Sequence, residues 1–142
     1  MKTALLVLAA VAAAGVARAD GAAGFAETCA ACHGEAGVGI PGVAPPLARP
    51  AFWTALGDKA PQYLSGVMAG GMGGKLTVDG QVYVGVIMPS QSHLGAATLA
   101  EIGTYVLQGL GGTTAVVDVE TVEAAIKAPP SHADLKAMRP ES

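Results

Sequence analysis

The two cysteines of this 142-residue chain stand close together, and a histidine directly follows the second one. They form the pattern Cys29-Ala30-Ala31-Cys32-His33. This pattern is typical of c-type haem attachment, because two intervening residues let both thiols reach the vinyl groups on one porphyrin edge. The next residue then lies beneath the iron, where a neutral imidazole nitrogen can coordinate it. We therefore predict one covalently attached haem c, bound through Cys29 and Cys32, with His33 as an iron ligand.

Three other kinds of site use paired cysteines. A thiol–disulfide exchange site of the thioredoxin type needs a strand leading into the motif and a parallel sheet, and the sequence indicates neither. A structural disulfide is compatible with the spacing, but so short a loop gains little chain entropy. A zinc site takes four ligands, and only His93 and His132 remain as obvious additional donors. Haem is favoured because Gly-rich loops and an export signal accompany the motif.

Haem iron has a sixth coordination position, and several side chains could fill it. The candidates are Met68, Met72, Met88, Met138, His93 and His132. Met88 is followed by Pro89, and a loop stiffened by proline can present a thioether rigidly. Met68 belongs to the apolar stripe of an expected helix, which is more typical of a core residue. Met72 lies in a flexible Gly run. We predict Met88 as the second axial ligand.

Short helices separated by loops are expected to position these side chains. A helix is predicted over Asp20–Ala30, because Gly21, Phe25 and Cys29 recur every four residues and share one face. The stretch from 34 to 50 is rich in Gly and Pro and predicts a loop. A brief helical turn is expected over residues 52–55.

The second half of the chain predicts helices around one hairpin. Pro61 suits the first turn of a helix that ends at the Gly70–Gly74 run. Asp79-Gly80 lies between two short apolar runs and predicts a type I′ hairpin, which needs support from other elements. Gly95–Leu110 is the most regular predicted helix. Its start at Gly95 lacks the side-chain cap that Ser or Thr would give.

The N-terminus has the composition of a secretory signal peptide. Lys2 supplies a positive start, residues 4–15 are almost entirely Ala, Leu and Val, and Ala17-Arg18-Ala19 resembles a cleavage site. A transmembrane anchor is the alternative, but the apolar run is shorter than the ~20 residues that a spanning helix needs. We predict a signal peptide over residues 1–19, export to the periplasm and no stable membrane span after cleavage.

The remaining chain is acidic and poor in large core-forming side chains. Without Lys2 and Arg18 it has 6 basic and 11 acidic residues, a formal net charge of −5. This balance argues against nucleic-acid binding, which rewards clustered Lys and Arg. It suits docking partners with basic surface. Aromatic residues make up only 4% of the chain, which fits a domain packed around a large apolar cofactor.

The order of these motifs resembles that of class I bacterial cytochromes c, over roughly residues 21–110. The resemblance rests on Cys29–His33, Pro45-Pro46-Leu47, Val86-Ile87-Met88-Pro89 and a last helix from Leu99 to Val106. It is strongest to haem domains that serve periplasmic dehydrogenases and respiratory chains. It implies a mainly α, cytochrome c-like fold of three to five short helices around one haem, with a small β-hairpin insertion.

The resemblance also implies roles around the haem. The carbonyl of Pro45 would accept a hydrogen bond from His33 and fix the tautomer of the imidazole. Trp53 and Tyr63 would pack against the haem or bond its propionates, and ordinary core positions suit them equally well.

The first and last helices of the family fold cross near the haem edge. Gly21 and Phe25 would therefore meet Ile102 and Tyr105. Gly103 would permit the close approach of the two helices, which explains a glycine inside a helix.

The implied function is electron transfer. With His33 and Met88 as ligands the iron is six-coordinate, so no substrate site remains and single electrons pass by Fe(II)/Fe(III) cycling. Redox proteins would be the partners, namely a dehydrogenase as donor and an oxidase or another cytochrome as acceptor. The alternatives are a dedicated haem subunit of a periplasmic dehydrogenase and a haem enzyme or gas sensor with a displaceable sixth ligand.

We divide the chain into a signal peptide (1–19), a cytochrome c domain (20–112) and a C-terminal extension (113–142). In the extension, the spacing of Val119, Val122 and Ile126 predicts one short amphipathic helix, which Pro129-Pro130 closes. The sequence leaves open whether the extension wraps the domain or contacts a partner.

Overall fold

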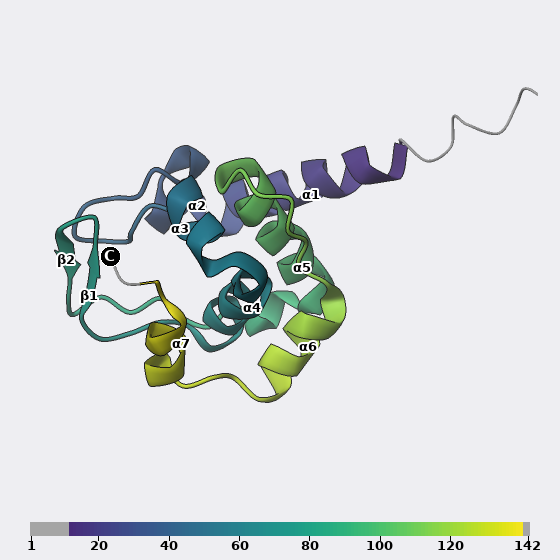
Figure 1. Ribbon diagram of the computed structural model, residues 1–142. Coiled ribbons are helices and arrows are strands. Elements are labelled where there is room, and N and C mark those ends of the chain that lie inside the picture. The colour runs from purple at the N-terminus through teal and green to yellow at the C-terminus, as the bar shows by residue number, and fades with distance from the viewer. Residues whose placement is uncertain (1–11, 141–142) are drawn as a thin grey trace, which may run out of the picture.

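The computed structural model describes residues 12–140, and it is mainly helical with one two-stranded hairpin (Figure 1). The helices are α1 (Ala12–Thr28), α2 (Ala30–His33), α3 (Pro50–Leu56), α4 (Ala60–Gly70), α5 (Ala96–Tyr105), α6 (Val119–Lys127) and α7 (His132–Met138). The strands are β1 (Leu76–Val78) and β2 (Gln81–Tyr83). The predicted mainly α fold with a small hairpin is confirmed. The part of α1 from Asp20 onward and helices α2 to α5 fall in the predicted haem domain, and α6 and α7 fall in the predicted extension.

The N-terminal helix is longer than the pattern predicted. It was expected to begin at Asp20 and begins at Ala12, inside the predicted signal peptide. Most of that predicted segment lies outside the described residues. Within the described part of the chain, no helix is both long enough and apolar enough to cross a bilayer.

Helices α1 and α5 cross closely, as predicted. A Cβ at Gly21 would overlap the backbone of Glu101, and one at Gly24 would lie 2.9 Å from the side chain of Ile102. Next to this contact the rings of Phe25 and Tyr105 lie 5.6 Å apart. Glycine on α1 therefore allows the two helices to touch, and this crossing fixes the end of α1 from which the cysteine motif continues.

The prediction for Gly103 was wrong in its partner. A Cβ at this position would lie 2.9 Å from Val117 Cγ2 and 3.0 Å from Met68 Cε, and none of its three nearest atoms belongs to α1. Gly103 therefore makes room for α4 and for the chain after α5. The glycines that allow the crossing with α1 belong to α1 itself.

Helices α3 and α4 bring aromatic side chains into the centre of the domain. The predicted turn is a full helix that begins at Pro50, where the missing N–H of proline costs no hydrogen bond. Pro61 lies in the first turn of α4, as predicted. Phe52, Trp53 and Tyr63 are buried together, with ring centroids 5.0–6.3 Å apart.

The hairpin follows the predicted turn. Strands β1 and β2 are antiparallel with Leu76 opposite Tyr83, and the turn residues Asp79 and Gly80 have φ angles of 50° and 78°. Positive φ at both positions is what a type I′ turn requires. Val78 and Tyr83 are buried, so the hairpin gains the support that two isolated strands lack.

The predicted Gly95–Leu110 helix changes its geometry near its end. Helix α5 starts after Gly95 without a side-chain cap, and from Val106 to Leu110 the chain forms a wider π-helical turn. There the amide of Gly111 donates to the carbonyl of Val106 at 2.8 Å. A Cβ at Gly111 would lie 2.7 Å from Trp53 Cδ1, so the wide turn brings this backbone against α3.

The C-terminal segment packs against the haem domain. Helix α6, predicted from the spacing of its valines and isoleucine, contacts α4 and α5, and α7 contacts α4 (Figure 1). Val122 and Leu135 are fully buried. Helix α7 was not predicted. It begins with a capping box, in which the Ser131 and Asp134 side chains bond each other's backbone amides.

Candidate functional site

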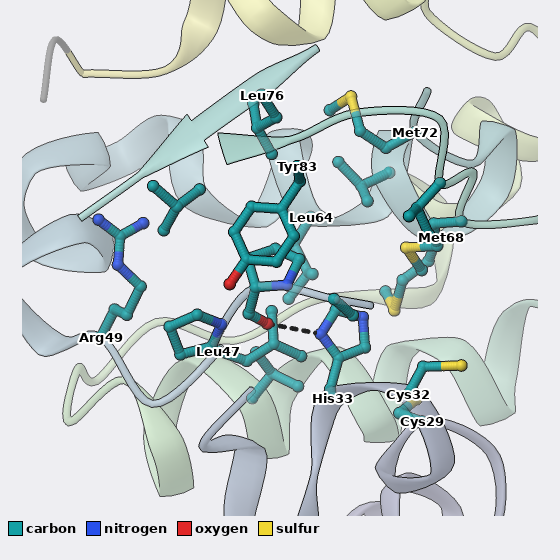
Figure 2. Close-up of a pocket in the computed structure, with 18 of the residues that line it drawn as sticks. Cys29, Cys32, His33, Leu47, Arg49, Leu64, Met68, Met72, Leu76 and Tyr83 are labelled. Carbon is teal, nitrogen blue, oxygen red and sulfur yellow. Dashed lines mark hydrogen bonds between the residues drawn. The ribbon is translucent and has the colours of Figure 1, made fainter. Parts of the chain in front are cut away.

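One cavity of about 260 Å³ gathers the residues that the sequence singled out. It lies between the end of α1, the loop before α3, helix α4, the hairpin and the loop before α5, and Figure 2 shows side chains converging on it from these elements. All five predicted site residues line it: Cys29, Cys32, His33, Pro45 and Met88. The remaining wall is mainly aliphatic and aromatic. The chemical roles of the five predicted site residues stay predictions, but the fold brings all five to one cavity.

The cysteines lie where helix α1 ends and helix α2 begins. Helix α1 ends at Thr28, and α2 carries Cys32 and His33 in its single turn. The amide of His33 donates to the carbonyl of Cys29 at 2.9 Å, which keeps the motif compact. No disulfide joins the two cysteines, and Cys29 is half-buried whereas Cys32 is exposed.

The electrostatics of Cys29 differ from those of an exchange site. Burial, with a smaller contribution from neighbouring Cys32, raises the pKa of the Cys29 thiol to about 11. Disulfide exchange depends on a thiolate, whose formation requires a depressed pKa. The protonated thiol therefore argues against the thioredoxin-type alternative.

His33 is buried and oriented by one hydrogen bond. Its Nδ1–H donates to the carbonyl of Pro45 at 2.9 Å, as Figure 2 shows. A carbonyl only accepts, so Nδ1 carries the proton and Nε2 keeps a lone pair. Burial lowers the pKa of His33, and the bond to Pro45 opposes that shift. The neutral imidazole that metal ligation needs is thus the favoured form at neutral pH.

Met88 is held in a short antiparallel bridge with Met72. The amide of Met88 donates to Met72 at 2.9 Å, and the amide of Met72 donates to Met88 at 3.1 Å. A Cβ at Gly71 would overlap the carbonyl of Met88, so the glycine lets the two backbones meet. Proline at 89 and this bridge together fix the backbone that carries the Met88 thioether.

The cavity separates the candidates for the sixth ligand into two groups. Met68, Met72 and Met88 line it, whereas Met138, His93 and His132 are not among its lining residues. Met68 is 4% exposed and belongs to the core of α4. Of the six candidates for the sixth ligand, the three that line the cavity are therefore all methionines. The bridge carries two of them, Met72 and Met88, on adjacent backbones.

Trp53 and Tyr63 also line the cavity. The indole N–H of Trp53 donates to the carbonyl of Leu47 at 2.7 Å, which ties α3 to the loop that follows the motif. The hydroxyl of Tyr63 accepts a 2.7 Å hydrogen bond from the guanidinium of Arg139. Burial raises the pKa of Tyr63, and the nearby Arg139 charge opposes the shift. The phenol is therefore protonated at neutral pH.

Two arginines in the wall were missed by sequence reasoning. Arg49 precedes α3 and Arg139 follows α7, so ninety positions of sequence separate them, yet both line the cavity. One sequence signal did exist. The chain has three arginines, and the third, Arg18, lies in the predicted signal peptide. The other two, Arg49 and Arg139, are scarce cations in an acidic chain and were therefore candidates for a specific binding role.

The residues fit a large apolar cofactor with an acidic edge. The cavity wall has apolar sides, two cationic side chains and, among the described lining residues, no carboxylate. In the described part of the chain no three His, Cys, Asp or Glu side chains gather as metal ligands. Two thiols, one imidazole and one thioether at an apolar cavity suit a covalently held haem.

Comparison with known proteins identifies the class. The chain matches the cytochrome c family over residues 18–109. It is 35% identical over 96 residues to cytochrome c-552 of Thermus thermophilus, an alignment covering 68% of this chain and 64% of that protein. A second Thermus thermophilus cytochrome c-552 is 35% identical over 94 residues, covering 66% of this chain and 70% of the relative.

The chain therefore belongs to the cytochrome c family. Together with the CxxCH motif, this makes it a class I monohaem c-type cytochrome with covalently attached haem c. The match spans a little under two thirds of the first relative's own length. The match to the cytochrome c family ends at residue 109, so α6, α7 and Arg139 lie beyond it.

Proposed function

We propose that the protein is a periplasmic electron carrier, with haem attached to Cys29 and Cys32 and iron ligated by His33 and Met88. The observation that carries this proposal is the orientation of His33. Its Nδ1–H is donated to Pro45, which leaves the Nε2 lone pair available to a metal. Both cysteines and Met88 line the same cavity as this imidazole.

When bound, haem c supplies an iron that alternates between Fe(III) and Fe(II) in one-electron steps. The thioether of Met88 favours the ferrous state, and the apolar wall disfavours the extra charge of the ferric state. Both effects raise the reduction potential. If His33 and Met88 both ligate the iron, no coordination position would remain for a substrate, and the task of the chain would be docking rather than bond making.

The proposed partners are redox proteins, a dehydrogenase as donor and an oxidase or another cytochrome as acceptor. Such encounters are small and transient. Without the proposed signal peptide the chain has a formal net charge of −5, which suits partners that present basic surface. The periplasmic location rests on the signal peptide proposed for residues 1–19.

A dedicated haem subunit of a periplasmic dehydrogenase is the second candidate, with the C-terminal extension as its clamp. The burial of Val122 and Leu135 within the chain's own fold favours the free carrier over this alternative. A haem enzyme or gas sensor would need a displaceable sixth ligand. Met88 is tied to Met72 by two backbone hydrogen bonds, which disfavours displacement.

Haem staining of a denaturing gel, combined with intact mass measurement, tests the proposal. We expect the exported chain to begin at Asp20 and to carry the mass of one haem. The double variant C29S/C32S is the matched control and should give no stained band. A wild-type chain without covalent haem would overturn the proposal. Reversible one-electron voltammetry of the purified protein tests the carrier function.

A further inference from the structure

The charges in the cavity wall are unusual for this chain. The chain as a whole has a formal net charge of −3, whereas the charged side chains in the described wall are those of Arg49 and Arg139. His33 is the third basic group there, and its Nδ1–H is already donated to the carbonyl of Pro45. An apolar cavity with two guanidinium groups is complementary to an apolar ligand that carries anionic groups.

The two arginines differ in how their charges are balanced. Arg49 forms a 2.7 Å ion pair with Asp79 at the hairpin turn, and its side chain is 14% exposed. Arg139 is half-buried and donates to the Tyr63 hydroxyl, which is neutral. Among the described residues, no carboxylate pairs with Arg139. A half-buried cation favours an anionic partner, and within the described residues the hydrogen-bond partner of Arg139 is the neutral Tyr63 hydroxyl.

A shared aromatic ring increases this imbalance. The guanidinium carbons of Arg49 and Arg139 both lie 4.8 Å from the ring centre of Phe52. The ring attracts each cation, but it brings two like charges close to each other. Asp79 compensates one of them. A second anion at Arg139 would compensate the other.

We propose that Arg139 binds a carboxylate of the haem, so that the C-terminal segment is part of the cofactor site. The inference rests on the proposed haem attachment. It assigns the second anion to the cofactor, whose two carboxylates form its acidic edge. Arg139 lies beyond the residues that match the family, so the family resemblance does not supply this contact.

The packing of α7 places Arg139 at the cavity. Leu135 is fully buried, and a Cβ at Gly66 of α4 would lie 2.8 Å from its Cδ2. The capping box at Ser131 fixes the start of this one-helix arm. Arg139 follows directly after the last residue of α7, so the docking of Leu135 determines where the guanidinium lies.

The variant R139Q tests the proposal by the midpoint potential of the haem. Removing a cation close to the haem stabilises the more positive ferric state, so the potential should fall. R139M keeps much of the aliphatic stem without the charge, and it should also lower the potential. R139K retains the charge, so its midpoint potential should fall less. K127Q removes one charge from an exposed position on α6 and should leave the potential nearly unchanged.

The outcomes separate this inference from the proposed function. Haem staining is done on the wild type and on every variant. A wild type without covalent haem overturns the proposed function itself. If the variants keep haem but R139Q and R139M match K127Q in potential, Arg139 has only a structural role and the inference fails. Should R139Q not fold, R139M and R139K give the same comparison. Circular dichroism melting of each variant separates a change in stability from a change in potential.

Discussion

The two sides of the cavity are built in different ways. On one side, Cys29–His33 and Pro45 come from one continuous stretch, and the longest link in it, between His33 and Pro45, spans 12 positions. The other side is assembled from α4, the Met72–Met88 bridge, the hairpin and Arg139. Local spacing determines the first side, whereas the second depends on how distant elements pack. We therefore expect changes on the first side to affect haem attachment and ligation by His33. Changes on the second side should affect the reduction potential of the haem or the stability of the fold.

Replacing His33 should have the largest effect. In H33A the iron loses the ligand supplied by the continuous side, so we expect loss of the six-coordinate, low-spin absorption spectrum although both cysteines remain. H93A is the matched control, because His93 is exposed and does not line the cavity. A normal spectrum in H33A, or a changed one in H93A, would contradict the assignment of the ligand.

Replacing Met88 tests the assembled side. M88A should lower the midpoint potential and alter the ferric spectrum, because the thioether that favours ferrous iron is lost. M72A removes the methionine opposite Met88 in the bridge and should change both quantities much less. If M72A has the larger effect, the two methionines exchange roles and Met72 is the ligand.

Stability should respond most to the C-terminal segment. L135A removes a fully buried side chain at the contact between α7 and α4, and we expect a loss of about 2–5 kcal/mol in the free energy of unfolding. Urea denaturation measures it. V119A, at a position 43% exposed on α6, is the control and should change stability little. Equal effects of the two changes would show that α7 is not docked as described.

The smallest effect is expected at the start of α6. Asp118 accepts hydrogen bonds from the amide and hydroxyl of Thr121 at 2.7 and 2.9 Å, and these bonds lower the pKa of its carboxyl. A lowered folded-state pKa means that the charged cap stabilises the fold above the unfolded pKa and that this contribution is lost as pH falls through the folded pKa.

D118A should therefore lower the melting temperature at pH 7, and its difference from the wild type should shrink in acid. D118N keeps a capping oxygen without a titrating charge, so its stability should depend less on pH in this range. Thermal melts of the three proteins at several pH values measure the difference. A gap between D118A and wild type that widens in acid would contradict the capping role.

The features predictable from sequence were those fixed by short spacing. The CxxCH motif, the Asp79-Gly80 turn and helix α6 each depend on residues within one or two turns of each other. The crossing of α1 and α5 followed from the family resemblance. These signals survive in a single sequence because the residues that cause each structure lie next to one another.

The features that were missed depend on distant contacts. Helix α7 has only one fully buried residue, Leu135, so its apolar periodicity is weak, and the Ser131–Asp134 capping pair was its one local signal. The partner of Gly103 was misassigned because the chain after α5 returns to cover it. Nothing near Arg139 in sequence indicates that it reaches the cavity, because Tyr63 and Phe52, its contacts, come from other helices.

The position of Arg139 in the chain has a consequence for biogenesis. A polypeptide is made from its N-terminus, so the motif that accepts the cofactor emerges before Arg139. Arg139 directly follows α7, so its place in the cavity wall forms only when α7 docks. The order of synthesis therefore allows haem to reach both thiols before Arg139 takes its place in the cavity wall.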